Sequence, residues 1–367
     1  MKKLEYTLSF TTHAFLGNAD QSAQWRTPPF KALLRQWWRI RNAKQHQYNH
    51  RNLREFEGDL FGNAWLEPQN GRSRFRKSRV MLRLDQWDGG KLSSSHWPGG
   101  EIESVVTTQD GKGRVRADVY LGFGPVLPPS RKENRPSVTI RGAIGTGKED
   151  GVVMSLFPFE LAQSLRDVLQ LMAWFGTIGS RARNGWGSLR MEPRGEAPVL
   201  AALPKSGDAL VLNISRPWMD CLDRDWPHAL GSLSGTPLVW VTQPYEDWRK
   251  AMGCLANIRV AVRRVAKGFA GPSGIGGIHL LGYPAGEKWE QGRLGKDARL
   301  GTQLRFKVAQ TAGGPVGVVS HFPCALPAAL KEKLDANQRN WIDQNERQLW
   351  KAIHDNLNSS NRVKPLS

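Results

Sequence analysis

Apolar and polar residues alternate from Leu4 to Phe10, and this period of two predicts a strand with one buried face. After a loop, Thr27 supplies an N-cap oxygen and Pro28 suits the first turn of a helix. Apolar residues then recur at helical spacing and predict the face that packs on the sheet: Phe30, Leu33, Leu34, Trp37 and Trp38. The other side carries Lys31, Arg35 and Arg39, a basic stripe expected to face phosphate or solvent.

The rest of the first half predicts further strands and a second helix. Residues 44–76 look irregular, and strands are expected at Arg79–Leu84, Arg116–Gly122, Ser137–Arg141, Val152–Phe157 and Ser188–Met191. Between the last two, Phe159–Phe175 has the apolar periodicity of a helix.

A stretch rich in Ala, Pro and Gly, Pro193–Pro204, predicts a linker, and a similar order of elements follows it. The second half predicts strands at Ala209–Ile214, Leu304–Val308 and Val316–Ser320, and helices at Tyr245–Val265 and Trp341–Leu357. We therefore expect an α+β protein of two tandem ferredoxin-like βαββαβ modules with loop insertions, residues 1–198 and 199–367.

The distribution of charge along the chain indicates a binding partner. The chain has 52 Lys and Arg against 33 Asp and Glu, a net charge of +19. Three zones hold basic residues and no acid: Gln21–Arg54, Pro68–Leu84 and Trp248–Gly286. A single basic run is often only a solvated face, but three such zones interleaved with Trp or Gly favour a nucleic acid.

Cysteine content and hydropathy indicate where in the cell the protein is expected. Cys221, Cys254 and Cys324 are scattered and fit neither a disulfide framework nor a zinc site. No run of 18 apolar residues predicts a spanning helix, and the first residues do not have the pattern of a secretory signal. We expect a cytoplasmic protein.

Two glycine-rich segments are candidates for phosphate contact. Gly142–Lys148 matches part of a nucleotide-binding loop, but Glu149 stands where Mg²⁺ ligation needs Ser or Thr, and a strand follows where a helix is needed. A hairpin turn is the better interpretation. In Gly176–Gly187, glycines such as Gly179 allow close approach to a ligand, Arg181 and Arg183 add charge, and Trp186 either stacks on a base or fills the sheet–helix junction. A tight helix-to-strand connection is the alternative.

Candidates for catalysis and metal binding are few. His46 and His50 have ligand-like spacing but no cysteine or acid close by, so no metal and no cofactor are expected. His13 follows the first strand and would suit a general base in RNA cleavage, although a lone histidine is more often structural. Asp20 is the only acid between Tyr6 and Arg54; it either orients a ribose hydroxyl or metal, or caps a turn.

Several segments together resemble the RAMP proteins of CRISPR effector complexes. Thr12–Asp20 and Arg26–Arg39 resemble the opening of these proteins, and the Leu-Leu-Arg-x-Trp-Trp-Arg helix looks most like the first RAMP subunit of the Cmr (type III-B) complex. Leu60-Phe61-Gly62, Ser78-Arg79-Val80, Tyr120–Pro125 and the turn Gly176–Ser188 match further family motifs. His279–Pro284 and Arg299–Gly301 resemble family motifs more weakly. Ile278 stands where the family commonly has Arg.

The resemblance implies two ferredoxin-like (RRM-like) modules in a subunit that binds RNA near the guide 3′ end and touches neighbouring RAMP subunits. It also implies that the subunit itself is not the nuclease, although related subunits cut target RNA with an Asp near the position of Asp20.

Together these observations predict a non-catalytic subunit that holds guide RNA, target RNA or both. The expected RNA-binding residues are Lys31, Arg35, Arg39, Arg74, Arg76, Lys77, Arg79, Gly179, Arg181, Arg183 and Trp186. The alternatives are an endoribonuclease that uses Asp20 or His13, and a protein-docking subunit whose basic face pairs with acidic neighbours.

Overall fold

The computed structural model describes residues 2–64, 75–92, 102, 104–108, 111, 113–283 and 299–367. The alternating segment at its N-terminus forms β1 (Leu4–Phe10), which lies between β7 (Gly147–Phe157) and β8 (Leu189–Arg194). β2 (Met81–Leu84) pairs with β7, so the strand order is β2-β7-β1-β8, with all neighbours antiparallel. With α1 (Thr27–Asn42) and α5 (Arg166–Phe175), the chain order is β1-α1-β2-β7-α5-β8.

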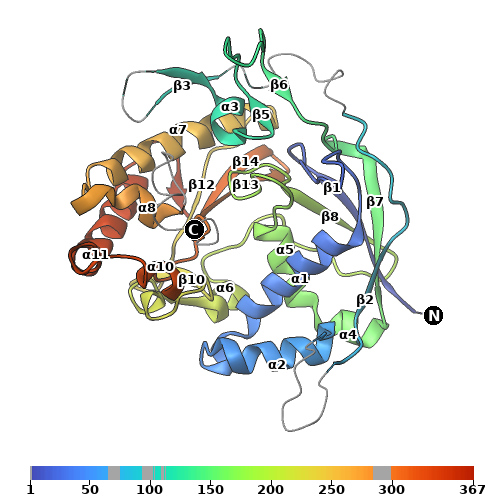
Figure 1. Ribbon diagram of the computed structural model, residues 1–367. Helices are drawn as coiled ribbons and strands as arrows, with labels where there is room; N and C mark the ends of the chain where they lie inside the picture. Colours follow the sequence, from blue (N-terminus) through green and yellow to red (C-terminus); the bar gives the residue numbers. More distant parts are fainter. Residues whose placement is uncertain are drawn as a thin grey trace.

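The second half repeats this order around another sheet. Its strands are β12 (Val239–Val241), β13 (Leu304–Thr311), β14 (Gly314–His321) and β15 (Lys364–Pro365), arranged β13-β14-β12-β15 with antiparallel neighbours. With α7 (Trp248–Lys267) and α11 (Ala336–Asn358), the chain order is β12-α7-β13-β14-α11-β15. Figure 1 shows the first sheet on the right, and α7 and α11 on the left.

The remaining helices and strands lie within or between these two parts. The helices are α2 (His50–Phe61), α3 (Ala117–Gly122), α4 (Phe159–Ser164), α6 (Ala209–Ile214), α8 (Gly277–Leu281), α10 (Ala328–Lys331), η1 (Lys44–His46), η2 (Asp220–Asp223) and η3 (Pro272–Gly274). The strands are β3 (Val105–Thr107), β4 (Arg114–Arg116), β5 (Val126–Leu127), β6 (Thr139–Ile140), β9 (Ser215–Pro217), β10 (Leu230–Leu233) and β11 (Thr236–Pro237).

The structure corrects several predicted elements. The segments 117–122 and 209–214 are helices, not strands; Val211 and Ile214, three residues apart, are the buried pair of α6. The stretch 44–76 contains helix α2, whose N-cap Asn49 accepts hydrogen bonds from the backbone of Arg51 and Asn52. The helix predicted at 159–175 is broken into α4 and α5 at Leu165. Helix α1 begins at Thr27 itself, with Arg26 as its N-cap residue.

Other expectations are confirmed. All five apolar residues on the predicted inner face of α1 are buried. Gly147 opens a strand and no helix, as expected for a hairpin and not for a nucleotide-binding loop. The three cysteines are buried and form no disulfide. Among the described residues, no helix is long and apolar enough to cross a membrane.

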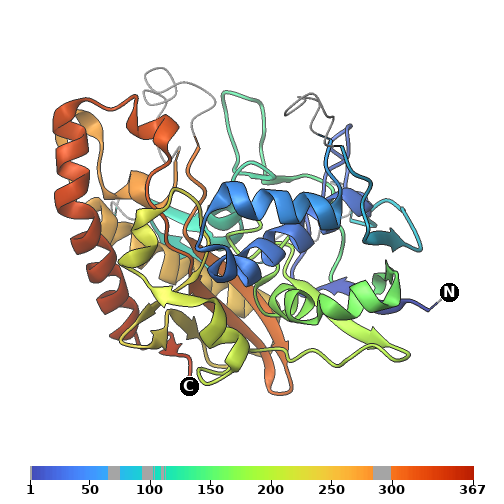
Figure 2. The same ribbon diagram turned by 90° about the horizontal axis from the view of Figure 1, so that it is seen from below.

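The two halves share their hydrophobic core. Nearly every residue of β13 and β14 is buried, because α7 packs on one side and α5 and β8 of the first half pack on the other. Trp350 of α11 contacts His321 at the end of β14. Trp37 of α1 and Phe175 of α5 both contact Phe322, which follows β14, at ring centroid distances of 5.5 and 5.7 Å. The view from below in Figure 2 shows the strands of the second half extending beside the helices of the first.

Candidate nucleic-acid interface

The glycine-rich turn 176–187 packs against the segment that follows β1. Gly179, Gly185 and Gly187 have φ values of +95°, +95° and +62°, which only glycine adopts without strain. A side chain at Gly179 would lie 2.7 Å from the Phe15 carbonyl oxygen, and Ser180 N donates to that same oxygen. The glycines were expected to bring the backbone close to a ligand, but they bring it close to the chain itself.

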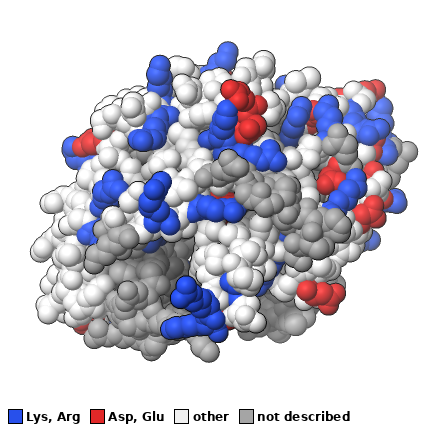
Figure 3. Space-filling model, turned by 90° about the horizontal axis from the view of Figure 1, so that it is seen from above, with Lys and Arg blue, Asp and Glu red and all other residues white. Residues whose placement is uncertain are grey.

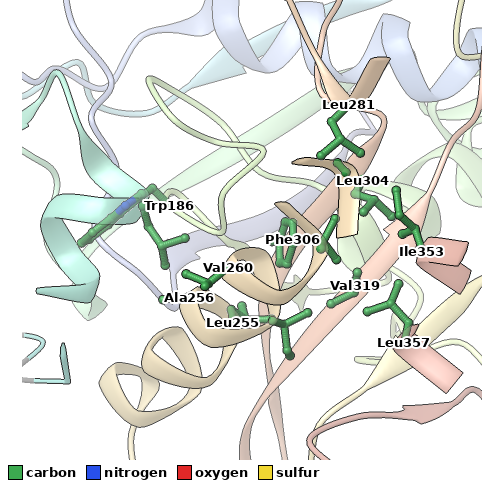
Figure 4. Close-up of a cluster of buried hydrophobic side chains, with 14 of the residues drawn as sticks. Trp186, Leu255, Ala256, Val260, Leu281, Leu304, Phe306, Val319, Ile353 and Leu357 are labelled. Carbon is green, nitrogen blue, oxygen red and sulfur yellow. The ribbon is translucent and has the colours of Figure 1, made fainter. Parts of the chain in front are cut away.

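Trp186 lies in the core and does not stack on a base. Its side chain is fully buried, with ring centroids 5.1 Å from Phe15 and 6.1 Å from Trp248. Figure 4 shows it among apolar side chains, near Ala256 and Val260 of α7. The structure therefore corrects the assignment of Trp186 to the RNA-binding set and supports the alternative that it fills the junction between sheet and helix.

Beside this turn lies a pocket of about 870 Å³, which we call the arginine pocket. Four arginines line it: Arg181 and Arg183 from the turn, and Arg259 and Arg263 from α7. Among the residues that the structure describes, no carboxylate lines the pocket. The exposed ring of Phe123 and the rings of Tyr120 and Tyr283 also contribute to its wall, so the pocket combines cations with aromatic surface.

Segments from both halves meet in this pocket. The turn 176–187, the segment Tyr120–Phe123, residues 278–283 and residues 300–302 all line it. These are four of the motifs that carry the family resemblance, including the two weaker ones in the second half. Phe306 N donates to the Arg183 carbonyl oxygen at 3.0 Å, so strand β13 holds the turn in place.

The arginines are held by neutral groups. Arg259 donates to the side-chain oxygen of Asn184, whose own Nδ2 donates to the Leu121 carbonyl oxygen at 2.7 Å. Arg183 lies directly against Gly301, and Arg181 lies against Gly124. Burial lowers the pKa of Arg181 and Arg183, and burial followed by repulsion from Arg263 lowers that of Arg259 to about 10. With a pKa of about 10, Arg259 remains cationic at neutral pH.

A smaller hollow of about 320 Å³ adjoins the arginine pocket at Gly179. Arg26 and Arg141 line it, and they donate to the Gly17 carbonyl oxygen at 2.7 Å and to Gln21 Oε1 at 3.1 Å, respectively. We call the hollow and the arginine pocket together the basic groove. Gly179 is a lining residue of both cavities.

The basic stripe on α1 is partly neutralised. Arg39 donates to both carboxylate oxygens of Glu57 on α2, at 2.6 and 2.7 Å, and Arg35 donates to the same carboxylate. Burial alone would raise the pKa of Glu57, but the two arginines outweigh burial and hold it below its ordinary value. Arg35 and Arg39 keep about a third of their side-chain surface exposed, so phosphate contact by these two residues stays a prediction, with part of their charge neutralised by Glu57.

The remaining predicted RNA-binding residues lie at a separate hollow, on the exposed surface, or outside the described residues. Lys31, Arg35, Arg54 and Arg76 line a separate hollow of about 510 Å³. Arg76 also pairs with Asp59, which does not line the hollow, at 2.6 Å. Lys77 and Arg79 are exposed. Arg74 lies outside the described residues.

The two candidate catalytic residues occupy different environments. His13 is buried against Trp248, with ring centroids 4.9 Å apart, so its ring does not face the surface. Asp20 is exposed, and the capping expected of it is done by Asn18, whose side chain accepts from the backbone of Asp20 and Ser22.

Within the described part of the chain, no three His, Cys, Asp or Glu side chains form a metal-binding group. His46 and His50 contact different rings, those of Phe56 and Trp226.

One face of the molecule is basic. Figure 3 shows that Lys and Arg are more numerous than Asp and Glu on this face. Sequence reasoning missed Arg26, Arg141, Arg259 and Arg263 as site residues. A signal existed for the last two: they stand four apart on α7, inside the acid-free zone Trp248–Gly286.

No protein-family model matches this chain, and no curated protein is significantly similar to it. Solved structures are similar over nearly its whole length. Cmr1 from Pyrococcus furiosus in its apo form has 14% identity and a TM-score of 0.46, and the match covers 94% of this chain and 97% of that one. A chain of the type III-B Cmr-beta complex bound to cognate target RNA has 11% identity and a TM-score of 0.47, covering 97% and 99%. A chain of a type IV-B CRISPR complex has 13% identity and a TM-score of 0.28, covering 56% and 95%.

Proposed function

We propose that this chain is an RNA-binding structural subunit of a type III-B CRISPR ribonucleoprotein effector. The observation that carries the proposal is the convergence of four family-like motifs, distant in sequence, on the arginine pocket. The partners are guide RNA, target RNA and the neighbouring RAMP subunits, and the proposed place is near the guide 3′ end. Each sheet with its two helices is a ferredoxin-like module, a proposal supported by their identical β-α-β-β-α-β order.

The proposed mechanism is electrostatic, with aromatic contacts in support. The guanidinium groups of the basic groove contact phosphates, which fixes the position of a strand without reading its sequence. Phe123 is 56% exposed at the pocket, where its ring is available to stack on an unpaired base. Such a surface favours single-stranded RNA, whose bases are free to leave their stack.

Binding of single-stranded RNA to the full chain at several salt concentrations tests this proposal. For each phosphate neutralised, the logarithm of the association constant should fall by about 0.7 per tenfold rise in salt. Arg181→Gln and Arg141→Gln should each weaken binding and flatten the slope. Lys351→Gln is the matched control, because Lys351 is exposed on α11, which lines neither part of the basic groove. Equal affinity and slope in all variants would contradict the assigned groove.

Membership of an effector complex needs a separate test. The tagged chain, purified from its native host, should bring down guide RNA that carries CRISPR repeat sequence, together with other RAMP subunits. Recovery of neighbouring proteins without RNA would favour the protein-docking alternative.

We further propose that the subunit holds RNA without cutting it. The burial of His13 supports this, since a general base must reach the ribose hydroxyl. Labelled RNA incubated with the wild type, with and without Mg²⁺, should stay intact. Cleavage that disappears in Asp20→Asn would overturn this proposal and favour the endoribonuclease.

A further inference from the structure

The arginine pocket holds more positive charge than its surroundings balance. Arg183, Arg259 and Arg263 are half-buried, and Arg259 donates to the neutral side-chain amide of Asn184. The buried Nε of Arg263 has no hydrogen-bond partner among the described residues. Buried cations are normally paired with carboxylates, because taking a charge out of water is costly. An unbalanced cluster of this kind has the chemistry of a site for an anion.

The same cations lie where the two halves meet. Arg183 comes from the turn of the first half, and Arg259 and Arg263 come from α7 of the second. Asn184 pairs with Phe306 as an isolated bridge, so the backbone next to these arginines joins the halves directly. Like charges from the two halves repel one another here, and an anion placed between them would attract both.

We propose that one phosphate group of a nucleic-acid strand binds among Arg183, Arg259 and Arg263, and that its binding stabilises the junction of the two halves. This inference rests on the proposed RNA-binding function and assigns the site that holds the strand most tightly. Guanidinium groups suit phosphate because each presents two parallel N–H donors that match a pair of its oxygens. The pocket volume of about 870 Å³ leaves room for the attached nucleoside beside Tyr120 and Phe123.

Thermal unfolding of the full chain tests the site without RNA. Inorganic phosphate and pyrophosphate should raise the melting temperature in a saturable way beyond sodium chloride at equal ionic strength, because they bind only the folded state. Arg263→Gln should lose this rise, while its melting temperature without phosphate stays equal to or above that of the wild type. Arg264→Gln is the matched control, since Arg264 is the exposed neighbour that does not line the pocket. An equal phosphate effect in both variants, or none in the wild type, would overturn the site.

Binding of short RNAs identifies the source of the phosphate and separates this inference from the proposed function. Arg263→Gln should weaken RNA binding about tenfold, and Arg264→Gln much less. The same weakening for RNA with hydroxyl ends assigns the site to a phosphodiester within the strand; weakening seen only with 5′- or 3′-phosphorylated RNA assigns it to a terminal phosphate. If the wild type binds RNA but the two variants weaken it equally, the site is wrong and the function stands. If phosphate stabilises the wild type and not Arg263→Gln while no RNA binds, the site stands and the function is wrong.

Discussion

The guanidinium of Arg183 lies against Gly301, where a methyl group would come within 1.4 Å of its Nη1. The end of a flexible side chain gives way before a backbone does, so Gly301→Ala should move Arg183 out of its place in the arginine pocket. We expect RNA affinity to fall about tenfold, equivalent to one charge-assisted hydrogen bond of about 1.5 kcal/mol. Fluorescence anisotropy measures this. Gly207→Ala, where a methyl group meets nothing within 4 Å, is the control, and equal affinities would contradict the placement of Arg183.

Glu57 gives a pH-dependent prediction. Its folded-state pKa is held below the ordinary value of 4.5, so its contribution to stability is complete above about pH 4.5 and disappears as the pH falls through the lowered pKa. Glu57→Gln should therefore lower the free energy of unfolding at pH 7 by about 1–2 kcal/mol, a modest value because Arg35 and Arg39 keep about a third of their surface exposed.

Urea denaturation of the wild type and Glu57→Gln at neutral and acidic pH measures this effect. The difference between the two proteins should shrink as the pH falls below 4.5. A difference that persists or grows in acid would show that Glu57 does not act through its charge.

At the level of elements, residue Ser188 connects β8 to β13. It is fully buried; its Oγ accepts from Val308 N at 2.9 Å and donates to the Gly185 carbonyl oxygen at 2.8 Å. Ser188→Ala leaves a buried N–H without its acceptor, and we expect a loss of about 1–3 kcal/mol in the free energy of unfolding. Ser359→Ala, at the exposed end of α11, should change stability by less than about 0.5 kcal/mol. Equal losses would rule out this role for Ser188.

Strongly periodic elements could be predicted from the sequence, and elements defined by tertiary packing could not. β1 and α1 have one buried face each, which shows as a period of two or of 3.6. In β13, Arg305 and Lys307 alternate with apolar residues as on a half-exposed strand, yet both are buried. Arg305 lies over the rings of Trp37 and Phe322, and Lys307 donates to the carbonyl oxygens of Ala173 and Leu189, all outside β13.

In the candidate site, too, local patterns could be predicted from the sequence and contacts made by tertiary packing could not. The turn with Arg181 and Arg183 could be found from its glycines and charges. The partial neutralisation of Arg35 and Arg39 could not be predicted. Glu57 is a buried acid that lies between the buried apolar residues Leu53 and Phe61 on one face of α2. Arg259 and Arg263 enter the pocket only because the two halves pack together, which no local pattern reveals.

At the scale of the whole molecule, the shared core predicts that the halves depend on each other. β13 and β14 are buried on both faces, so residues 199–367 alone would expose the apolar side that Trp37 and Phe175 cover. We expect fragments 1–198 and 199–367 to aggregate or lack cooperative unfolding when expressed separately, and to form a folded complex when co-expressed. Circular dichroism and size-exclusion chromatography check this, and a sharp, independent unfolding transition in either fragment would contradict it.

The hydrogen bonds that join the two halves at β13 have a consequence for genetics. A screen for loss of RNA capture should recover substitutions at inter-half positions such as Ser188 as well as at the arginines, although the Ser188 side chain lines neither cavity of the basic groove. Suppressors of such alleles are then expected at contacts that tighten the junction, far from any phosphate.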